Sequence, residues 1–190
     1  MPEVKRLFGF DGSVRLGSGP GDEGAFVRVV ELALWSPGSA GRLEIPVDIT
    51  RIVCADPIGV RTFEGNVYPT PSDADVVESK VISIINRRHI EHRDLVDLFL
   101  FSSHLRPDSG VRLQRKFASL GIASEAIQKQ LRDFAQYPDY HVKSIGAVVA
   151  GQLEAIASAQ IEASGGARNV FETVVELLTN QLKLGAGGAS

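Results

Sequence analysis

Three things are scarce in this 190-residue sequence: cysteine, net positive charge and long apolar runs. Cys54 is the only cysteine, so no internal disulfide can form, and a cytoplasmic location is expected. The formal net charge of −3 excludes a broadly basic nucleic-acid-binding coat, so no DNA partner is expected, although a local basic patch is compatible with that charge. No apolar run approaches the about 20 residues that a membrane-spanning helix needs, and residues 1–6 hold no apolar signal segment. No membrane partner is therefore expected.

The rest of the composition is that of a globular protein. Hydrophobic residues make up 44 % of the chain and charged residues 23 %, and the chain is long enough to bury a core. The distribution of these residues predicts an α+β fold. A β-rich part is expected over residues 1–70, a mainly α-helical bundle over 71–184 and a disordered tail over 185–190.

In the β-rich part, two segments have the pattern of a long hairpin. Residues 25–35 are rich in β-branched and aromatic side chains, residues 36–41 have the composition of a turn, and residues 42–49 alternate strictly between apolar and polar. Pro46 lacks a backbone N–H, so the second strand is expected at a sheet edge or at a bulge. The glycine-rich stretch from Gly9 to Gly24 is expected to be a mobile loop.

From Pro71 onward the spacing of apolar residues predicts helices, with glycine or proline at the breaks. Ser72 or Asp73 is expected to cap the first helix. The helices are expected at residues 73–88, 93–105, 110–120, 123–136, 140–163 and 168–183.

The first two of these helices carry a few charges at specific places. Lys80 lies beside the apolar face formed by Val77, Val81 and Ile84, where a lysine can reach a polyanionic ligand across a cleft. The alternative is an exposed lysine on a solvated flank. In the second helix Asp94 and Asp97 share a face. They are either substrate- or metal-positioning acids, or acids that complement the helix dipole.

A turn crowded with cations joins the two helices. Five of the seven residues from Arg87 to Arg93 can carry a positive charge near pH 6, so the turn can hold a phosphate, a nucleotide or an RNA backbone. A solvated helix–helix connection explains the same residues without any ligand. His89 and His92 are weak metal candidates because no cysteine or third histidine lies nearby.

Taken together, the segments form an ordered pattern of Glu78-x-Lys80, an apolar helical face, the basic turn, and Arg93-Asp94-Leu-x-Asp97-Leu. This pattern resembles the abortive-infection nucleotidyltransferase toxins of the AbiEii/AbiGii family, relatives of the polymerase-β-like nucleotidyltransferases, over about residues 42–101. The resemblance implies that residues 1–70 belong to a truncated nucleotidyltransferase-like core.

The same resemblance implies roles for individual side chains. Lys80 would contact the nucleotide phosphates, and Asp94 would complete the catalytic group with Arg93 in support. Asp97 would be structural, or would contact the catalytic side chains without touching the substrate. Arg87 and Arg88 of the basic turn join Lys80 and Arg93 as expected phosphate-binding residues.

A Gly-Ser turn followed by an Asp-x-Asp pair, the family's most diagnostic motif, is not recognisable here. Gly12-Ser13 is followed by Asp22-Glu23, but the glycine-rich residues between them cannot form the required helix and strand. In the family these carboxylates hold Mg²⁺ against the phosphates of a nucleoside triphosphate, so the metal ligands of this chain are unknown. Glu44 and Asp48, on the polar face of the 42–49 segment, are alternative candidates for an additional carboxylate, and both also suit the solvent side of an edge strand.

Three hypotheses about function follow. The first is an AbiEii-type protein that transfers a nucleotide from a nucleoside triphosphate to RNA, such as a tRNA end. This chain looks like the later part of such an enzyme, so it is expected to be incomplete or inactive alone. The second is a non-catalytic domain of the same origin that binds a nucleotide, RNA or a protein, and the third is an accidental resemblance. The resemblance also implies Mg²⁺ and a nucleoside triphosphate as cofactors and a cognate antitoxin as partner, and an uncovered sheet edge predicts a homodimer.

Overall fold

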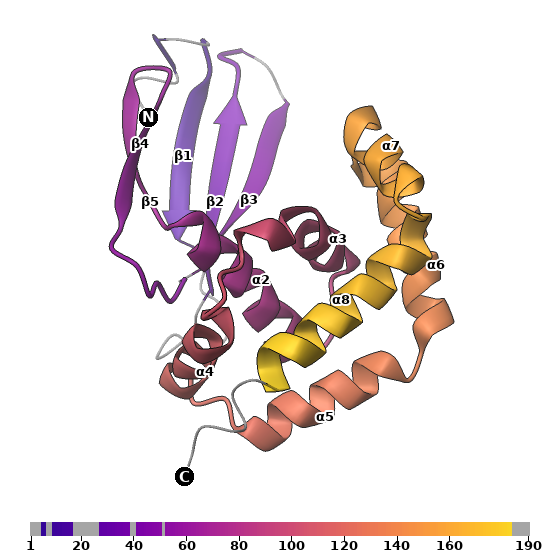
Figure 1. The fold of residues 1–190 in the computed structure, drawn as a ribbon. Helices are drawn as coiled ribbons and strands as arrows, with labels where there is room; N and C mark the ends of the chain where they lie inside the picture. Colours follow the sequence, from indigo (N-terminus) through magenta and orange to yellow (C-terminus); the bar gives the residue numbers. More distant parts are fainter. Residues whose placement is uncertain (1–4, 7–8, 17–26, 39–40, 51, 184–190) are drawn as a thin grey trace. The chain divides into compact units, whose positions relative to one another are not determined.

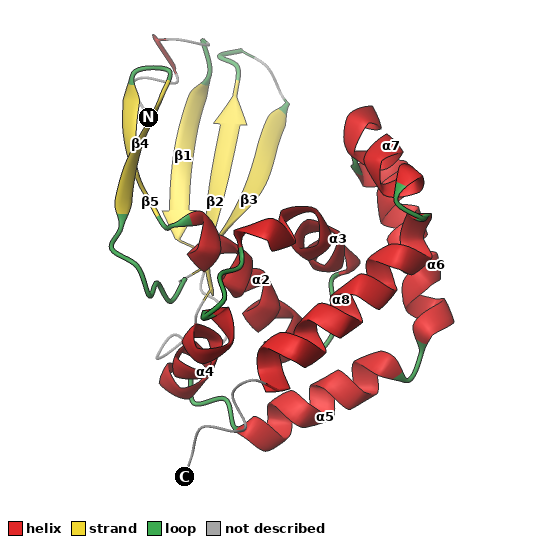
Figure 2. Ribbon diagram, in the orientation of Figure 1, coloured by secondary structure: helices red, strands yellow, loops and turns green. Residues whose placement is uncertain are grey.

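The computed structural model describes residues 5–6, 9–16, 27–38, 41–50 and 52–183. Its contacts divide the chain into two compact units, residues 1–52 and 53–190. The α+β prediction is confirmed: small antiparallel sheets come first in the chain and helices follow (Figures 1 and 2). None of the helices in the described ranges is long and apolar enough to cross a membrane.

The first unit contains a three-stranded antiparallel sheet. Its strands are β1 (Asp11–Leu16), β2 (Val27–Trp35) and β3 (Arg42–Thr50), in the order β1-β2-β3. The predicted β2–β3 hairpin is confirmed, with Trp35 opposite Arg42. Pro46 lies on β3, an edge strand of the sheet as described, which confirms the expectation drawn from its missing N–H.

The expectation of a loop from Gly9 to Gly24 is wrong for its first part. Residues Asp11 to Leu16 form β1 and pair with β2, with Val14 opposite Leu32. Val14 and Leu16 supply the alternation of a strand, and backbone hydrogen bonds to β2 outweigh the low strand propensity of Gly12. The remainder of that stretch, including Asp22-Glu23, lies outside the described residues.

The second unit begins with a two-stranded hairpin. Strand β4 (Gly59–Phe63) pairs with β5 (Asn66–Thr70) through a two-residue turn at Glu64 and Gly65. Both turn residues have positive φ, 48° and 77°, which is the geometry of the tight turn that matches the twist of a hairpin. Along β4 every side chain is exposed.

Seven α-helices and one 3₁₀ turn are described after this hairpin. The α-helices are α2 (Asp73–Asn86), α3 (His92–Phe101), α4 (Ser109–Ser119), α5 (Ser124–Ala135), α6 (Pro138–Gln152), α7 (Ala155–Ala163) and α8 (Gly166–Lys183). The 3₁₀ turn η1 covers Ser102–His104. Helix α8 packs against α3, α4, α5, α6 and α7 and so lies at the centre of the unit (Figure 1). The core around it includes the fully buried side chains of Val81, Leu95, Leu98, Leu113, Ile145, Ile161, Val174 and Leu178.

One predicted helix, residues 140–163, is in fact two. Helix α6 ends at Gln152, Leu153 is extended with ψ 152°, and α7 begins at Ala155. The hydroxyl of Ser158 donates to the carbonyl of Val149 at 2.8 Å, and this bond satisfies one of the carbonyls that the end of α6 leaves without a helical partner. The other predicted helices agree with the structure to within a few residues at each end.

Candidate functional site

Lys80 of α2 and the two carboxylates of α3 form an ion cluster. Lys80 Nζ donates to Asp94 Oδ1 at 2.8 Å and to Asp97 Oδ2 at 2.9 Å. The arrangement follows from local structure: Ser72 caps α2 by accepting the N–H of Asp75, and α2 packs against α3 through their apolar faces. Lys80 leaves the flank of α2 next to that contact and meets the first two turns of α3.

Two arginines of the basic turn complete the cluster. Arg87 Nη1 donates to the second oxygen of Asp94 at 2.7 Å, and Arg93 Nε lies 3.5 Å from Asp97 Oδ1. Arg93 also donates to the backbone carbonyl of Gln152 at 3.2 Å. Each carboxylate therefore contacts two cations, and the five charges leave a formal excess of one positive charge.

Lys80 is held in its charged form and keeps donor capacity. Burial by itself lowers the pKa of Lys80, but its hydrogen bonds to Asp94 and Asp97 outweigh burial, and the net pKa is raised above its ordinary value. An ammonium group has three N–H donors. The carboxylates take two of them, no third acceptor is found among the described residues, and the side chain is 33 % exposed. A third donor is thus available to a ligand.

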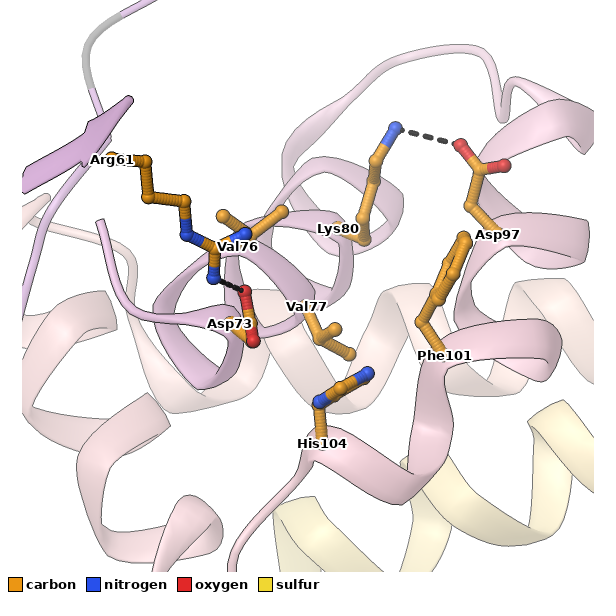
Figure 3. A pocket seen from close by; sticks show the side chains of 8 residues that line it. All are labelled: Arg61, Asp73, Val76, Val77, Lys80, Asp97, Phe101 and His104. Carbon is orange, nitrogen blue, oxygen red and sulfur yellow. Dashed lines mark hydrogen bonds and ion pairs between the residues drawn. The ribbon is translucent and has the colours of Figure 1, made fainter. Parts of the chain in front are cut away.

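This donor opens on a cavity of about 400 Å³ (Figure 3). The cavity is lined by Arg61 of β4, by residues of α2 and α3, and by His104 of η1; the full lining is Arg61, Asp73, Val76, Val77, Lys80, Asp97, Phe101 and His104. Arg61 donates to Asp73, so the formal charges of Arg61, Lys80, Asp73 and Asp97 cancel. The cavity is large enough for a nucleotide-sized ligand.

Arg88 does not join the Lys80 cluster. Arg88 forms no ion pair with any described residue and lines a separate cavity. Glu44 is exposed in the first unit and lies 3.1 Å from Arg42, whereas only the backbone of Asp48, opposite Val29 in the sheet, belongs to what the structure describes. In the described ranges, no group of three or more histidine, cysteine or acidic side chains could hold a metal ion.

No sequence pattern points to Arg61, Phe101 or His104, which line the cavity with Lys80. They come from three elements and become neighbours only through the fold. An exposed arginine in a short strand is not distinguishable from a solvated one by its sequence context.

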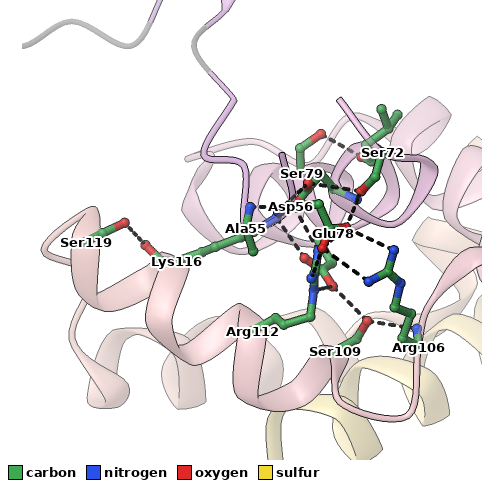
Figure 4. Close-up of polar contacts among 12 residues, drawn as sticks. Ala55, Asp56, Ser72, Glu78, Ser79, Arg106, Ser109, Arg112, Lys116 and Ser119 are labelled. Carbon is green, nitrogen blue, oxygen red and sulfur yellow. Dashed lines mark hydrogen bonds and ion pairs between the residues drawn. The ribbon is translucent and has the colours of Figure 1, made fainter. Parts of the chain in front are cut away.

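A second charged cluster is buried between α2, α4 and the segment before β4 (Figure 4). Arg112 of α4 donates to Asp56, Asp75 and Glu78 at 2.7–3.2 Å. Lys116 Nζ lies 2.6 Å from Asp75 Oδ1, and 2.7 Å from Glu78 Oε2, the latter an ion pair without hydrogen-bond geometry. With Arg106 beside Asp56, three cations face three carboxylates, so the cluster is neutral as a whole.

The pKa shifts in this cluster have clear causes. The hydrogen bonds from Arg112 and Ser72 hold the pKa of Asp56 far below its usual range, and the hydrogen bond to Asp56 in turn raises the pKa of Arg112. Burial acts to raise the pKa of Asp75, but the backbone N–H groups of Ala55 and Asp56 and the ammonium of Lys116 outweigh burial and lower it. Each carboxylate of this cluster is paired with a cation of the same cluster, so it holds the fold together rather than a ligand.

The comparisons with known proteins give a loose likeness only. No protein-family model matches the sequence, and no curated protein matches it significantly. A crystal structure from H. pylori, provisionally described as a nucleotidyltransferase, overlaps 92 % of this chain and 69 % of its own length at 14 % identity and a TM-score of 0.44. The crystal structure of JHP933 from Helicobacter pylori overlaps 92 % of this chain and 66 % of its own length at 14 % identity and a TM-score of 0.39. The chain thus spans about two thirds of each of these proteins, and neither an activity nor a site residue is transferred from them.

Proposed function

We propose that this protein is nucleotidyltransferase-like, of the AbiEii toxin type, and that its Lys80 cluster binds the phosphates of a nucleoside triphosphate destined for RNA. One observation carries the proposal: Lys80 Nζ lies between Asp94 and Asp97, which the chain sequence separates from it by 14 and 17 positions. Lys80, Asp94 and Asp97, three of the residues that carried the sequence resemblance, therefore meet at one point.

The geometry is suited to holding a phosphate. Asp94 and Asp97 fix the direction of the ammonium group, and its remaining N–H can donate to a phosphate oxygen in the cavity. Arg87 and Arg93 keep the two carboxylates charge-balanced, so an incoming phosphate is not repelled by a bare pair of negative charges.

The described residues do not fit Mg²⁺. Both carboxylates of the cluster are already paired with cations, and the described ranges contain no other group of metal ligands. No step of the transfer is therefore assigned to a metal here, and we expect little or no transfer by this chain alone. This feature favours a second candidate function, a non-catalytic nucleotide-binding domain of the same origin.

The test separates binding from transfer. Binding of a fluorescent nucleoside triphosphate is measured for the wild type, for Lys80→Gln and for Lys143→Gln, a matched control at an exposed lysine of α6. We expect Lys80→Gln to weaken binding about tenfold or more, since it removes a charge-assisted hydrogen bond, and Lys143→Gln to have no effect. Arg87 and Arg93 still pair with the two carboxylates in Lys80→Gln, so the variant should fold.

The transfer itself is assayed with labelled nucleoside triphosphates, Mg²⁺ and total RNA. Incorporation that disappears in Lys80→Gln and Asp94→Asn supports the enzyme, and nucleotide binding without incorporation supports the second candidate. Binding that is equal in wild type and Lys80→Gln refutes both.

A further inference from the structure

A second cavity, of about 420 Å³, is lined in part by the basic turn. Its walls come from the turn itself, from the start of α3, from the C-terminal half of α5 and from the start of α6. The residues that matter for its chemistry are Arg88, His89, His92, Phe134, Tyr140 and His141.

One wall of this cavity is a continuous aromatic cluster. The ring of His92 meets that of Tyr140 edge to face, with centroids 5.5 Å apart, and Phe134 meets His141 in the same way at 4.8 Å. Behind them the ring of His141 stacks on Phe171, 5.6 Å between centroids and 9° between planes. His141 is buried at the base of the cluster, whereas Tyr140 is 63 % exposed and presents an aromatic ring to solvent.

The aromatic wall is uncharged at neutral pH. Burial, and secondarily the neighbouring His92, lowers the pKa of His141 to about 4, and burial also lowers the pKa of His92. The two rings share a hydrogen bond, with His92 Nε2 3.0 Å from His141 Nδ1. Neutral rings of this kind offer π-faces to a planar ligand and do not act as cations.

The positive charge is supplied at the rim, by Arg88. Its neighbours Arg87 and Arg93 are tied to the carboxylates of the Lys80 cluster, whereas Arg88 pairs with no carboxylate among the described residues. Asp133 also lines the cavity, but Lys129 donates to its carboxylate at 2.6 Å. Of the three arginines of the basic turn, one therefore lines this cavity and the two others belong to the Lys80 cluster.

We propose that this second cavity binds an unpaired base of a single-stranded RNA. The base stacks on the exposed ring of Tyr140, with the ring of His92 at its edge, and Arg88 contacts the adjoining backbone phosphate. Aromatic stacking combined with a cation at the rim is how proteins hold single strands, and it works for any base because every base has a π-face. The choice of RNA rests on the proposed function, in which RNA accepts the nucleotide; the site would then hold the acceptor strand.

A duplex is not a suitable occupant. Paired bases hide their faces in the stack, so only a strand with a free base can use the aromatic wall. A free nucleotide presents the same base with its phosphates, but it lacks the continuing backbone, and it belongs to the Lys80 site under the proposed function.

The test measures binding of a fluorescein-labelled single-stranded oligoribonucleotide of eight residues by anisotropy at low salt. The variants are Tyr140→Ala and Arg88→Gln. Their matched controls are Tyr68→Ala on the hairpin and Arg115→Gln on the exposed side of α4. We expect each cavity variant to weaken binding roughly tenfold, in keeping with the loss of one base–aromatic stack or one phosphate contact, and the controls to bind as the wild type does.

Three outcomes overturn the proposal: a duplex that binds as tightly as the single strand, cavity variants that bind as the controls do, or no binding by the wild type. Lys80→Gln separates this proposal from the proposed function, because it should leave oligoribonucleotide binding unchanged. If Lys80→Gln loses nucleotide binding and keeps oligoribonucleotide binding, the result supports two separate sites. If Lys80→Gln loses both, the result contradicts the second site.

Discussion

The His92–His141 pair makes the stability of the second unit sensitive to mild acid. His141 is 6 % exposed and its pKa is lowered to about 4, mainly by burial, from an ordinary value of 6.5. The folded chain therefore binds fewer protons than the unfolded chain between about pH 6.5 and about pH 4. Acidification through this window favours unfolding, and stability rises again as the pH is raised.

The magnitude follows from the two pKa values. For a group with pKa 6.5 unfolded and about 4 folded, the free energy of unfolding falls by about 2 kcal/mol between pH 7 and pH 5. His92, whose pKa is also lowered by burial, adds to the loss in the same direction. The depressed carboxylate pKa values contribute little in this range, because unfolded aspartates ionise near pH 3.8.

The assay is urea unfolding followed by circular dichroism at pH 7, 6 and 5. His141→Phe keeps the ring stack on Phe171 but removes the titrating group, so its stability difference between pH 7 and pH 5 should shrink by about 2 kcal/mol. His89→Gln changes an exposed histidine and should leave the wild-type difference intact. A wild-type stability that is flat between pH 7 and pH 5, or an undiminished loss in His141→Phe, would refute the reasoning.

Three further predictions concern the buried charges and the core. Lys116→Met removes one of the two cations that pair with the buried carboxylates of Asp75 and Glu78 and should reduce the free energy of unfolding by about 3–5 kcal/mol, while Lys129→Met on the surface should change it by less than about 1 kcal/mol, both by urea titration. The pKa of Asp75 is lowered in the fold, so its contribution to the free energy of unfolding is present above pH 3.8 and is lost as the pH falls further. Urea titrations extended below about pH 4 should therefore show a second drop in stability, and the absence of that drop contradicts the prediction. Leu178→Ala should lower stability by about 2–5 kcal/mol because its side chain is fully buried, and an equal effect of Ile156→Ala, whose side chain is 82 % exposed, would show that burial is not the cause.

Local sequence patterns predicted most of the elements but not their interruptions. The alternation in residues 42–49 and the turn before it were sufficient for the β2–β3 hairpin, since both signals lie within a few residues of each other. Strand β1 was missed because its stability comes from pairing with a strand that begins eleven positions later, and Gly12 weakens its local signal. The break at Leu153 was missed because no proline marks it; a side chain from the next helix, Ser158, stabilises it.

The candidate site was predictable in part for a similar reason. Lys80, Asp94 and Asp97 lie on two consecutive helices, so helical spacing and a short turn bring them together. The buried cluster was not predictable, because Asp75 and Glu78 have the sequence context of ordinary acids near a helix start. Their partners Arg112 and Lys116 follow 34 to 41 positions later. Nor did the sequence distinguish Arg88 from Arg87, since which of the two pairs with Asp94 depends on the direction of each side chain at the end of α2.

The β4–β5 hairpin begins and ends next to the helices of the second unit. Ser72 Oγ donates to Asp56 Oδ2 at 2.6 Å, so the fifteen residues between them form a loop whose two ends are joined by a hydrogen bond. The entropic cost of closing such a loop changes slowly with its length, by about 0.6 kcal/mol for each doubling. The helices should therefore tolerate hairpins of different length and composition at this place. Since Arg61 is the hairpin's contribution to the first cavity, exchange of this one module is a route by which related chains could change what the cavity accepts without rebuilding the helices.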